Sequence, residues 1–219
     1  MKQDNHRVIL STAYLAPVQY FTKLIGYDEV WIELGEHFLK QSYRNRCTIL
    51  TSNGIQNLSI PVTEGSNSKR VIRDVKISWD HPWQKLHWKA ILSAYNNAPF
   101  FEYYADCLAP FYTSEKWTFL IDFNREIQSV VLDELNLKCR INPTEEFTPP
   151  GKFTTDTADF RYVIDPKPGR KSEDNKFLPV TYMQVFQEKF GFTPNLSIID
   201  LLFNEGPMAV EMLRKSLVE

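Results

Sequence analysis

The N-terminal part of the chain alternates between short apolar runs and a helical pattern. Arg7–Leu10 is a short apolar run typical of a buried strand. Pro17 suits the first turn of a helix and Gly26 suits its end. The apolar face between them consists of Tyr20, Phe21, Leu24 and Ile25. Val30–Ile32 is a second short strand, so the segment predicts a compact parallel βαβ unit.

A hairpin pattern follows. Cys47–Leu50 and Ile55–Val62 flank Asn53-Gly54, a dipeptide that tolerates positive φ at both turn positions. Glu64–Lys69 is polar and predicts a loop. Val71–Ser78 alternates apolar and polar residues, which predicts a further strand.

The middle of the chain has helical periodicity. Asp80-His81-Pro82 is typical of a helix cap with proline in the first turn. The apolar face predicted for that helix is Leu86, Ala90, Ile91, Ala94 and Tyr95. Residues 99–107 predict a short aromatic helix, and a long amphipathic helix is expected from near Ser114 to Leu135.

Residues 142–175 break this pattern. They contain many threonines and charges, and five prolines: Pro143, Pro149, Pro150, Pro166 and Pro168. A loop of this length is usually a lid, a binding segment or partly disordered. Helices are predicted again at about residues 180–190, 196–204 and 207–217.

These elements predict an α/β fold. We expect an N-terminal mixed sheet with a βαβ start and a hairpin, followed by a mainly helical C-terminal half. The length of 219 residues predicts one domain over residues 1–219. Its α/β part would span about residues 1–80 and its helical part about residues 81–219.

Composition excludes several classes of function. Lys and Arg number 25 against 27 Asp and Glu, so the net charge is −2, and a dedicated nucleic-acid binder is not expected. Neither G-x-G-x-x-G nor a Walker A loop is present. No apolar run approaches the roughly 18 residues of a membrane helix, so we expect no integral membrane segment. The three cysteines, at wide spacing, predict no disulfide framework, and we expect a soluble protein of the reducing cytoplasm.

Two loops are the candidate functional segments. In an open α/β sheet, ligands bind beyond the carboxyl ends of the strands. That rule selects residues 11–17, which follow the first strand, and residues 33–46, which follow the second.

The second of these loops is rich in cations. Lys40, Arg44 and Arg46 lie close together, with Tyr43 and Asn45 between them. If the segment enters a strand, Arg44 and Arg46 share one face. Two guanidinium groups on one face suit a phosphate or a carboxylate, so a small anionic ligand is expected. A solvated strand face with surface ion pairs explains the same pattern equally well.

Histidines offer one candidate base and no metal site. His37 lies beside Glu36 in the second loop, and either side chain could act as a general base. A lone histidine is more often a polar surface residue. His81 and His87 are six positions apart, which does not place them on one helix face. We therefore expect no metal site, and the residues name no cofactor.

Two further groups have a structural and a chemical interpretation. Ser11 and Thr12 are potential nucleophiles, but a loop that hydrogen-bonds its own backbone explains them better. Trp79, Trp83 and Trp88 cluster near a turn between a strand and a helix. One of them could face a ligand, although most aromatic residues belong to the core.

The order of motifs resembles the WbqC-like family of bacterial proteins. The matching positions occur almost from end to end of the chain: Tyr14, Pro17, Tyr20-Phe21, Lys23-Leu24-Ile25, Asp28-Glu29-Val30, Lys40, Tyr43, Asn45-Arg46, Leu58–Val62, Tyr95, Ala98-Pro99-Phe100, Leu120, Tyr182, Leu196–Asn204 and Gly206-Pro207. Each motif is modest by itself, and their order carries the resemblance.

The resemblance implies a role in O-antigen or capsule assembly. It implies a transferase that adds an aminoacyl (glycine) group to a nucleotide-linked or lipid-linked sugar. Tyr14, Lys40, Tyr43, Arg44, Asn45 and Arg46 would then bind substrate, with His37 or Glu36 as the base. The family usually carries Gln-Pro before the first-loop tyrosine, where this chain has Thr12-Ala13. This departure keeps a second hypothesis open, a non-catalytic binding or scaffold protein for glycan-assembly enzymes.

Overall fold

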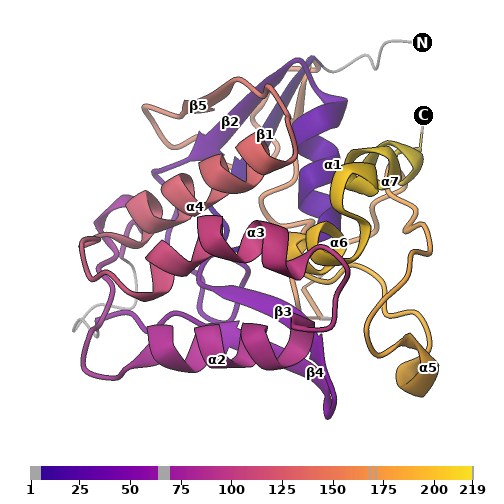
Figure 1. The fold of residues 1–219 in the computed structure, drawn as a ribbon. Coiled ribbons are helices and arrows are strands. Elements are labelled where there is room, and N and C mark those ends of the chain that lie inside the picture. Colours follow the sequence, from indigo (N-terminus) through magenta and orange to yellow (C-terminus); the bar gives the residue numbers. More distant parts are fainter. Residues whose placement is uncertain (1–5, 64–69, 168, 171, 219) are drawn as a thin grey trace.

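A four-stranded parallel sheet organises the fold (Figure 1). The computed structural model describes residues 6–63, 70–167, 169–170 and 172–218, so the loop predicted at residues 64–69 lies outside the described part. The strand order is β5-β2-β1-β6. The strands are β1 (Arg7–Ser11), β2 (Glu29–Glu33), β5 (Ile141–Pro143) and β6 (Thr157–Asp159).

The predicted βαβ unit is confirmed. Helix α1 (Val18–Gly26) connects β1 to β2, and the two strands pair in parallel with Val8 opposite Val30. Both valines are fully buried. The apolar runs therefore form the centre of the sheet, as expected for parallel strands covered on both faces.

The predicted hairpin is also confirmed, and it forms a sheet of its own. Strands β3 (Arg46–Thr51) and β4 (Gly54–Ser59) pair antiparallel. Gly54 has φ of 100°, a backbone conformation that glycine adopts without strain. Helix α2 (Trp83–Tyr95) packs against β3.

Most of the regular elements in the second half of the chain are helices, so the predicted α/β class holds. The α-helices are α2 (Trp83–Tyr95), α3 (Phe101–Leu108), α4 (Leu120–Glu134), α5 (Gln187–Phe190), α6 (Ile198–Glu205) and α7 (Ala209–Lys215). Short 3₁₀ helices are η1 (Ile72–Asp74), η2 (Ala109–Tyr112) and η3 (Gly206–Met208). Helix α1 packs against α6 and α7, and α3 packs between α4 and α6 (Figure 1). No helix in the described residues is long and apolar enough to cross a membrane.

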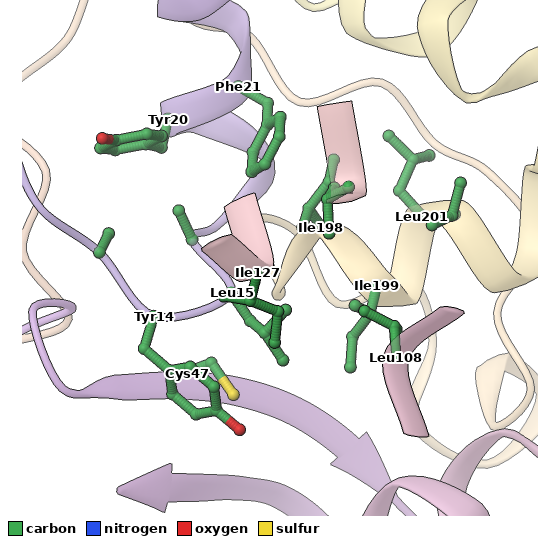
Figure 2. Close-up of a cluster of buried hydrophobic side chains, with 14 of the residues drawn as sticks. Tyr14, Leu15, Tyr20, Phe21, Cys47, Leu108, Ile127, Ile198, Ile199 and Leu201 are labelled. Carbon is green, nitrogen blue, oxygen red and sulfur yellow. The ribbon is translucent and has the colours of Figure 1, made fainter. Parts of the chain in front are cut away.

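The core joins the N-terminal loop to the C-terminal helices. Figure 2 shows Tyr14 and Leu15, from the loop after β1, beside Cys47 of β3 and Ile198 of α6. Every residue of α6 from Ile198 to Asn204 is buried. A helix that is buried on all sides belongs to the interior, and α6 contacts α1, α3 and α7 there.

Two predicted boundaries around the middle of the chain are wrong. Val71–Ser78 is not a strand, because it contains η1 and makes only single bridges, including Ile77 with Val62. Ile72 and Val75 are buried three residues apart, a spacing that fits the 3₁₀ helix better than a strand. The long helix begins at Leu120 rather than near Ser114, since Phe119 bridges Lys76 in extended conformation.

The start of α2 also differs from the prediction. Asp80 does not cap the helix, because its carboxylate accepts a 2.6 Å hydrogen bond from Ser78 and Pro82 occupies the N-cap position. Ile91, Ala94 and Tyr95 are buried as predicted, but Trp83 and His87 are also inside and Leu86 is 61% exposed. At the start of the helix, the rings of Trp83 and His87 therefore pack on the core in place of Leu86.

Two segments near the C-terminus were misassigned. The helix predicted at about residues 180–190 is confined to Gln187–Phe190. Before it the chain alternates, with Tyr182 and Gln184 buried and Met183 69% exposed. The segment 142–175 was expected to be a loop, but it contributes both edge strands of the sheet, β5 and β6.

Candidate functional site

The carboxyl ends of the four parallel strands meet at one edge of the sheet. The strands end at Ser11, Glu33, Pro143 and Asp159. This is the edge where α/β proteins bind ligands. The loops that leave it carry two buried arginines, which organise the strand-end network described below.

Arg44 forms the first half of this network. Its Nε donates to Oε1 of Glu36 at 2.8 Å and its Nη2 donates to Oε2 at 2.6 Å. Nη2 also donates to the Ser11 hydroxyl at 2.7 Å. Arg44 is 2% exposed and Glu36 is fully buried. The two-point pairing fixes the orientation of both side chains.

Arg161 forms the second half. It pairs with Glu33 at 2.9 Å and with Asp159 at 2.7 Å, and it donates to the carbonyl oxygen of Thr148. Burial by itself would lower the pKa of Arg161, but hydrogen bonds and the charge of Asp159, followed by the charge of Glu33, raise it. Glu33 also accepts a hydrogen bond from Thr144, the first residue after β5.

Ser11 connects the two halves. Its hydroxyl accepts from Arg44 and donates to the backbone oxygen of Arg161 at 3.2 Å. Two guanidinium groups thus face three carboxylates: those of Glu33, Glu36 and Asp159. The carboxylates neutralise the positive charge of the two guanidinium groups. The arginines are therefore not free to hold an anion.

The segment between β5 and β6 covers the strand ends. The guanidinium carbon of Arg161 lies 4.9 Å from the ring centre of Phe153 and 5.6 Å from that of Phe147. A Cβ added at Gly35 would lie 2.8 Å from the Cβ of Phe147, so the covering segment packs directly on the loop after β2. Tyr162, 39% exposed, lies at the rim with both guanidinium carbons 5.7 Å from its ring centre.

The space left at this edge is small. A cavity of about 10 Å³ lies beside Ser11, Arg44 and Arg161, which is about one water molecule in size. A ligand larger than a water molecule does not fit in this cavity. Among the described residues, no three His, Cys, Asp or Glu side chains gather in a metal-binding arrangement.

The candidate base and the cations occupy different environments. Glu36 is held by Arg44, whereas His37 and Lys40 are exposed. Arg46 begins β3 and donates from Nε to the hydroxyl of Ser59 at 3.1 Å. Arg44 and Arg46 thus contact different partners, and the structure does not bring them together as one anion-binding pair.

Tyr14, Tyr43 and Asn45 hold the two loops in place. The backbone N–H of Tyr14 donates to the carbonyl oxygen of Tyr43 at 2.9 Å. Burial raises the pKa of Tyr43 to about 12. The side-chain amide of Asn45 donates to the carbonyl oxygen of Ile60 at 2.7 Å. The fully buried Tyr14 contacts Tyr112 and His87, away from the strand ends.

Sequence reasoning missed Asp159 and Arg161. Both lie in the segment interpreted as a proline-rich loop, and β6 has three residues, too few for a recognisable alternation. The available signal was the spacing of an acid and an arginine two positions apart, which places both on one side of an extended chain.

Comparison with known proteins identifies a family. The profile of the WbqC-like protein family matches residues 12–165, which include the strand-end network from Thr12 onward. A protein of Mycobacterium tuberculosis (strain ATCC 25618 / H37Rv), "Uncharacterized protein Rv1507c", is 30% identical over 223 aligned positions, covering 94% of this chain and 96% of that protein. No solved structure matches the chain.

Proposed function

Because the chain belongs to the WbqC-like protein family, we propose that it is a transferase of bacterial surface-polysaccharide biosynthesis, in the assembly of O-antigen or capsule. Its substrate would be a nucleotide-linked or lipid-linked sugar in the cytoplasm, and the group transferred would be an aminoacyl (glycine) group. The proposed location of this chemistry is the loop of residues 33–46, which contributes Glu33, Glu36 and Arg44 to the strand-end network.

One observation carries the proposal: four charged side chains are buried together at the strand ends. Glu33, Glu36, Arg44 and Arg161 are each at most 2% exposed. Burying ion pairs is often no better for stability than packing apolar residues of similar volume. Ligands of α/β proteins bind at this edge of the sheet, so the buried charges support it as the candidate site.

The proposed roles follow from exposure and contacts. Lys40 and Arg46 carry the accessible positive charge and would bind the phosphate of a sugar-linked substrate. His37, exposed on the same loop, would act as the general base. Glu36 would position Arg44 and the loop, since both its oxygens already accept hydrogen bonds.

A second candidate is a non-catalytic binding protein that assembles other glycan enzymes. The observation that favours it is the closed state of the site, where the arginines are neutralised and the cavity is about 10 Å³. In that interpretation the network would only fix the loops, and no substrate would enter the strand ends.

Ligand-induced stabilisation distinguishes the candidates. We would measure thermal midpoints with nucleotide sugars, sugar phosphates, amino acids and aminoacyl donors, and assay product formation by mass spectrometry. A ligand at a hundred times its dissociation constant stabilises the folded state by about 2.7 kcal/mol. The transferase proposal expects a shift that Arg46→Ala or Lys40→Ala reduces, and turnover that His37→Ala removes.

Arg125→Ala is the matched control, because Arg125 is an exposed arginine of α4 whose side chain is 75% exposed. It should leave shift and turnover unchanged. Turnover that survives His37→Ala would exclude that residue as the base. Partner capture without any turnover would favour the scaffold.

A further inference from the structure

A second, larger cavity lies away from the strand ends. It has a volume of about 590 Å³ and lies between the start of α2 and the residues around η2. Aromatic rings of Trp79, Trp83, Trp88 and Tyr112 line it. The volume falls in the range of small-molecule sites, and none of its lining residues belongs to the strand-end network.

The aromatic rings are held in fixed positions. The ring centres of Trp79 and Trp83 are 5.5 Å apart, and Trp88 stacks on Tyr112 at 5.3 Å with 21° between the ring planes. Trp83 and Tyr112 are each 3% exposed, whereas Trp79 and Trp88 are half-buried. The buried pair therefore supports two tryptophans that keep accessible surface at the cavity.

A buried polar side chain fixes the two walls together. Gln84, 7% exposed, donates from Nε2 to the carbonyl oxygen of Phe111 at 2.8 Å and to that of Ser114 at 2.6 Å. These bonds fasten α2 to the segment around η2 across the cavity. A wall that is already hydrogen-bonded needs little ordering when a ligand binds.

The charges around the cavity cancel. Lys85 and Lys89 line it together with Asp80 and Glu115, and all four residues are exposed. Such a rim offers both hydrogen-bond donors and acceptors, and the four formal charges sum to zero. It suits a neutral ligand with many hydroxyl groups better than a phosphate or another anion.

We propose that this cavity is a carbohydrate-binding site, which takes a neutral sugar ring. The apolar C–H face of a pyranose packs on an indole ring, whose face carries partial negative charge. The hydroxyl groups at the ring edge would bond to Asp80, Glu115 and the two lysines. The proposal concerns binding alone and does not depend on transferase activity at the strand ends.

The site is physically connected to the first loop. The hydroxyl of Tyr14 lies 2.8 Å from the hydroxyl of Tyr112, which lines the cavity. Tyr14 lies three residues after the end of β1 and is buried behind that wall. A sugar held at the tryptophans would therefore contact a wall that the strand-end loop supports.

The test is a binding experiment on the whole chain. The probes are methyl glycosides of hexoses, 6-deoxyhexoses and N-acetylhexosamines, all neutral. Methyl hexuronides, AMP, UMP and inorganic phosphate are the anionic comparisons. Indole ¹H–¹⁵N NMR signals report binding, and Trp→Phe variants assign them. We expect a neutral glycoside to shift the signals of Trp79 and Trp88 but not that of Trp31, a half-buried tryptophan of β2.

Variants then decide whether the tryptophans carry the binding. Trp88→Ala and, separately, Trp79→Ala should each weaken it at least about tenfold, with Trp31→Ala as the matched control that retains it. Circular dichroism confirms folding of each variant. The proposal is overturned if no glycoside binds, if both cavity variants bind as the wild type does, or if AMP, UMP or phosphate binds there in place of sugars. Loss of turnover in His37→Ala with sugar binding intact separates this site from the proposed catalytic one.

Discussion

The hydroxyl oxygen of Ser11, the last residue of β1, accepts a 2.7 Å hydrogen bond from Nη2 of Arg44. The contact joins the end of a central strand to a loop that begins after the neighbouring strand. Because Arg44 is buried, its N–H groups need protein partners, and the serine supplies one that Glu36 does not. Ser11 is thus better explained as a structural link than as a nucleophile.

Replacing Ser11 should therefore destabilise the protein. Ser11→Ala leaves one guanidinium N–H of the buried Arg44 without a partner, which costs about 1–3 kcal/mol. Urea unfolding would measure the change. Ser93→Ala, at an exposed position of α2, is the control and should stay within about 0.5 kcal/mol of wild type. Equal stability of wild type and Ser11→Ala would show that the contact contributes nothing.

Removing Arg161 should loosen the covering segment. Arg161→Met leaves Glu33 and Asp159 without their buried cation and removes the hydrogen bond to Thr148. We expect a loss of about 3–5 kcal/mol and faster proteolysis between residues 144 and 160. Cleavage sites would be mapped by mass spectrometry, with Arg125→Met as the exposed control. An unchanged cleavage rate would mean that the cover is held by other contacts.

A buried ion pair fixes the C-terminal part of the chain to α1. Lys23 lies 2.7 Å from Asp174, with side chains 0% and 3% exposed. Burial lowers the pKa of Lys23, although the hydrogen bond to Asp174 opposes that effect. Lys23→Met should cost about 3 kcal/mol because Asp174 remains charged and buried, and the double variant Lys23→Met/Asp174→Leu should recover part of it.

Chemical denaturation of the single and double variants measures this coupling. The exposed pair of Lys116 and Glu126 provides a contrast, since Lys116→Met should cost less than about 1 kcal/mol. If the double variant is no more stable than Lys23→Met, the uncompensated charge of Asp174 is not the source of the loss.

The elements that sequence patterns predicted are those with strong local signals. The βαβ start and the hairpin around Asn53-Gly54 were found because apolar runs and turn residues define them locally. Strands β5 and β6 were missed because each has three residues and pairs with strands far away in the chain. Their place in the sheet depends on tertiary packing.

The candidate site was also predicted only where local sequence patterns define it. The rule for strand ends selected the edge at which Arg44 and Glu36 lie. Spacing could not show that Arg44 turns inward to Glu36 while Arg46 bonds to Ser59, since a loop does not fix the direction of its side chains. Nor could it show the partners that Asp159 and Arg161 find across the sheet.

Two buried groups, Asp200 and His87, should change the unfolding free energy with pH in opposite directions. In the wild type these two effects should largely cancel. Burial raises the pKa of Asp200 from 3.8 to about 6, although Tyr182, Tyr95 and Gln184 donate hydrogen bonds to it. Its contribution to stability is full below pH 3.8 and is lost as the pH rises through 6. Burial lowers the pKa of His87 from 6.5 to about 4, so its contribution is full above pH 6.5 and is lost as the pH falls through 4.

Each of these pKa changes corresponds to roughly 3 kcal/mol, at 1.36 kcal/mol per pKa unit, and the two have opposite signs. In the wild type, these two groups together should therefore change the unfolding free energy little between about pH 4 and 6.5. Asp200→Asn should make the unfolding free energy rise more steeply with pH than in wild type, because only the histidine effect remains. His87→Phe should make the unfolding free energy fall with rising pH relative to wild type, because only the Asp200 effect remains. Urea unfolding across this range measures the slopes, which are independent of any constant loss caused by the substitutions, and slopes parallel to wild type in both variants would contradict the assignment.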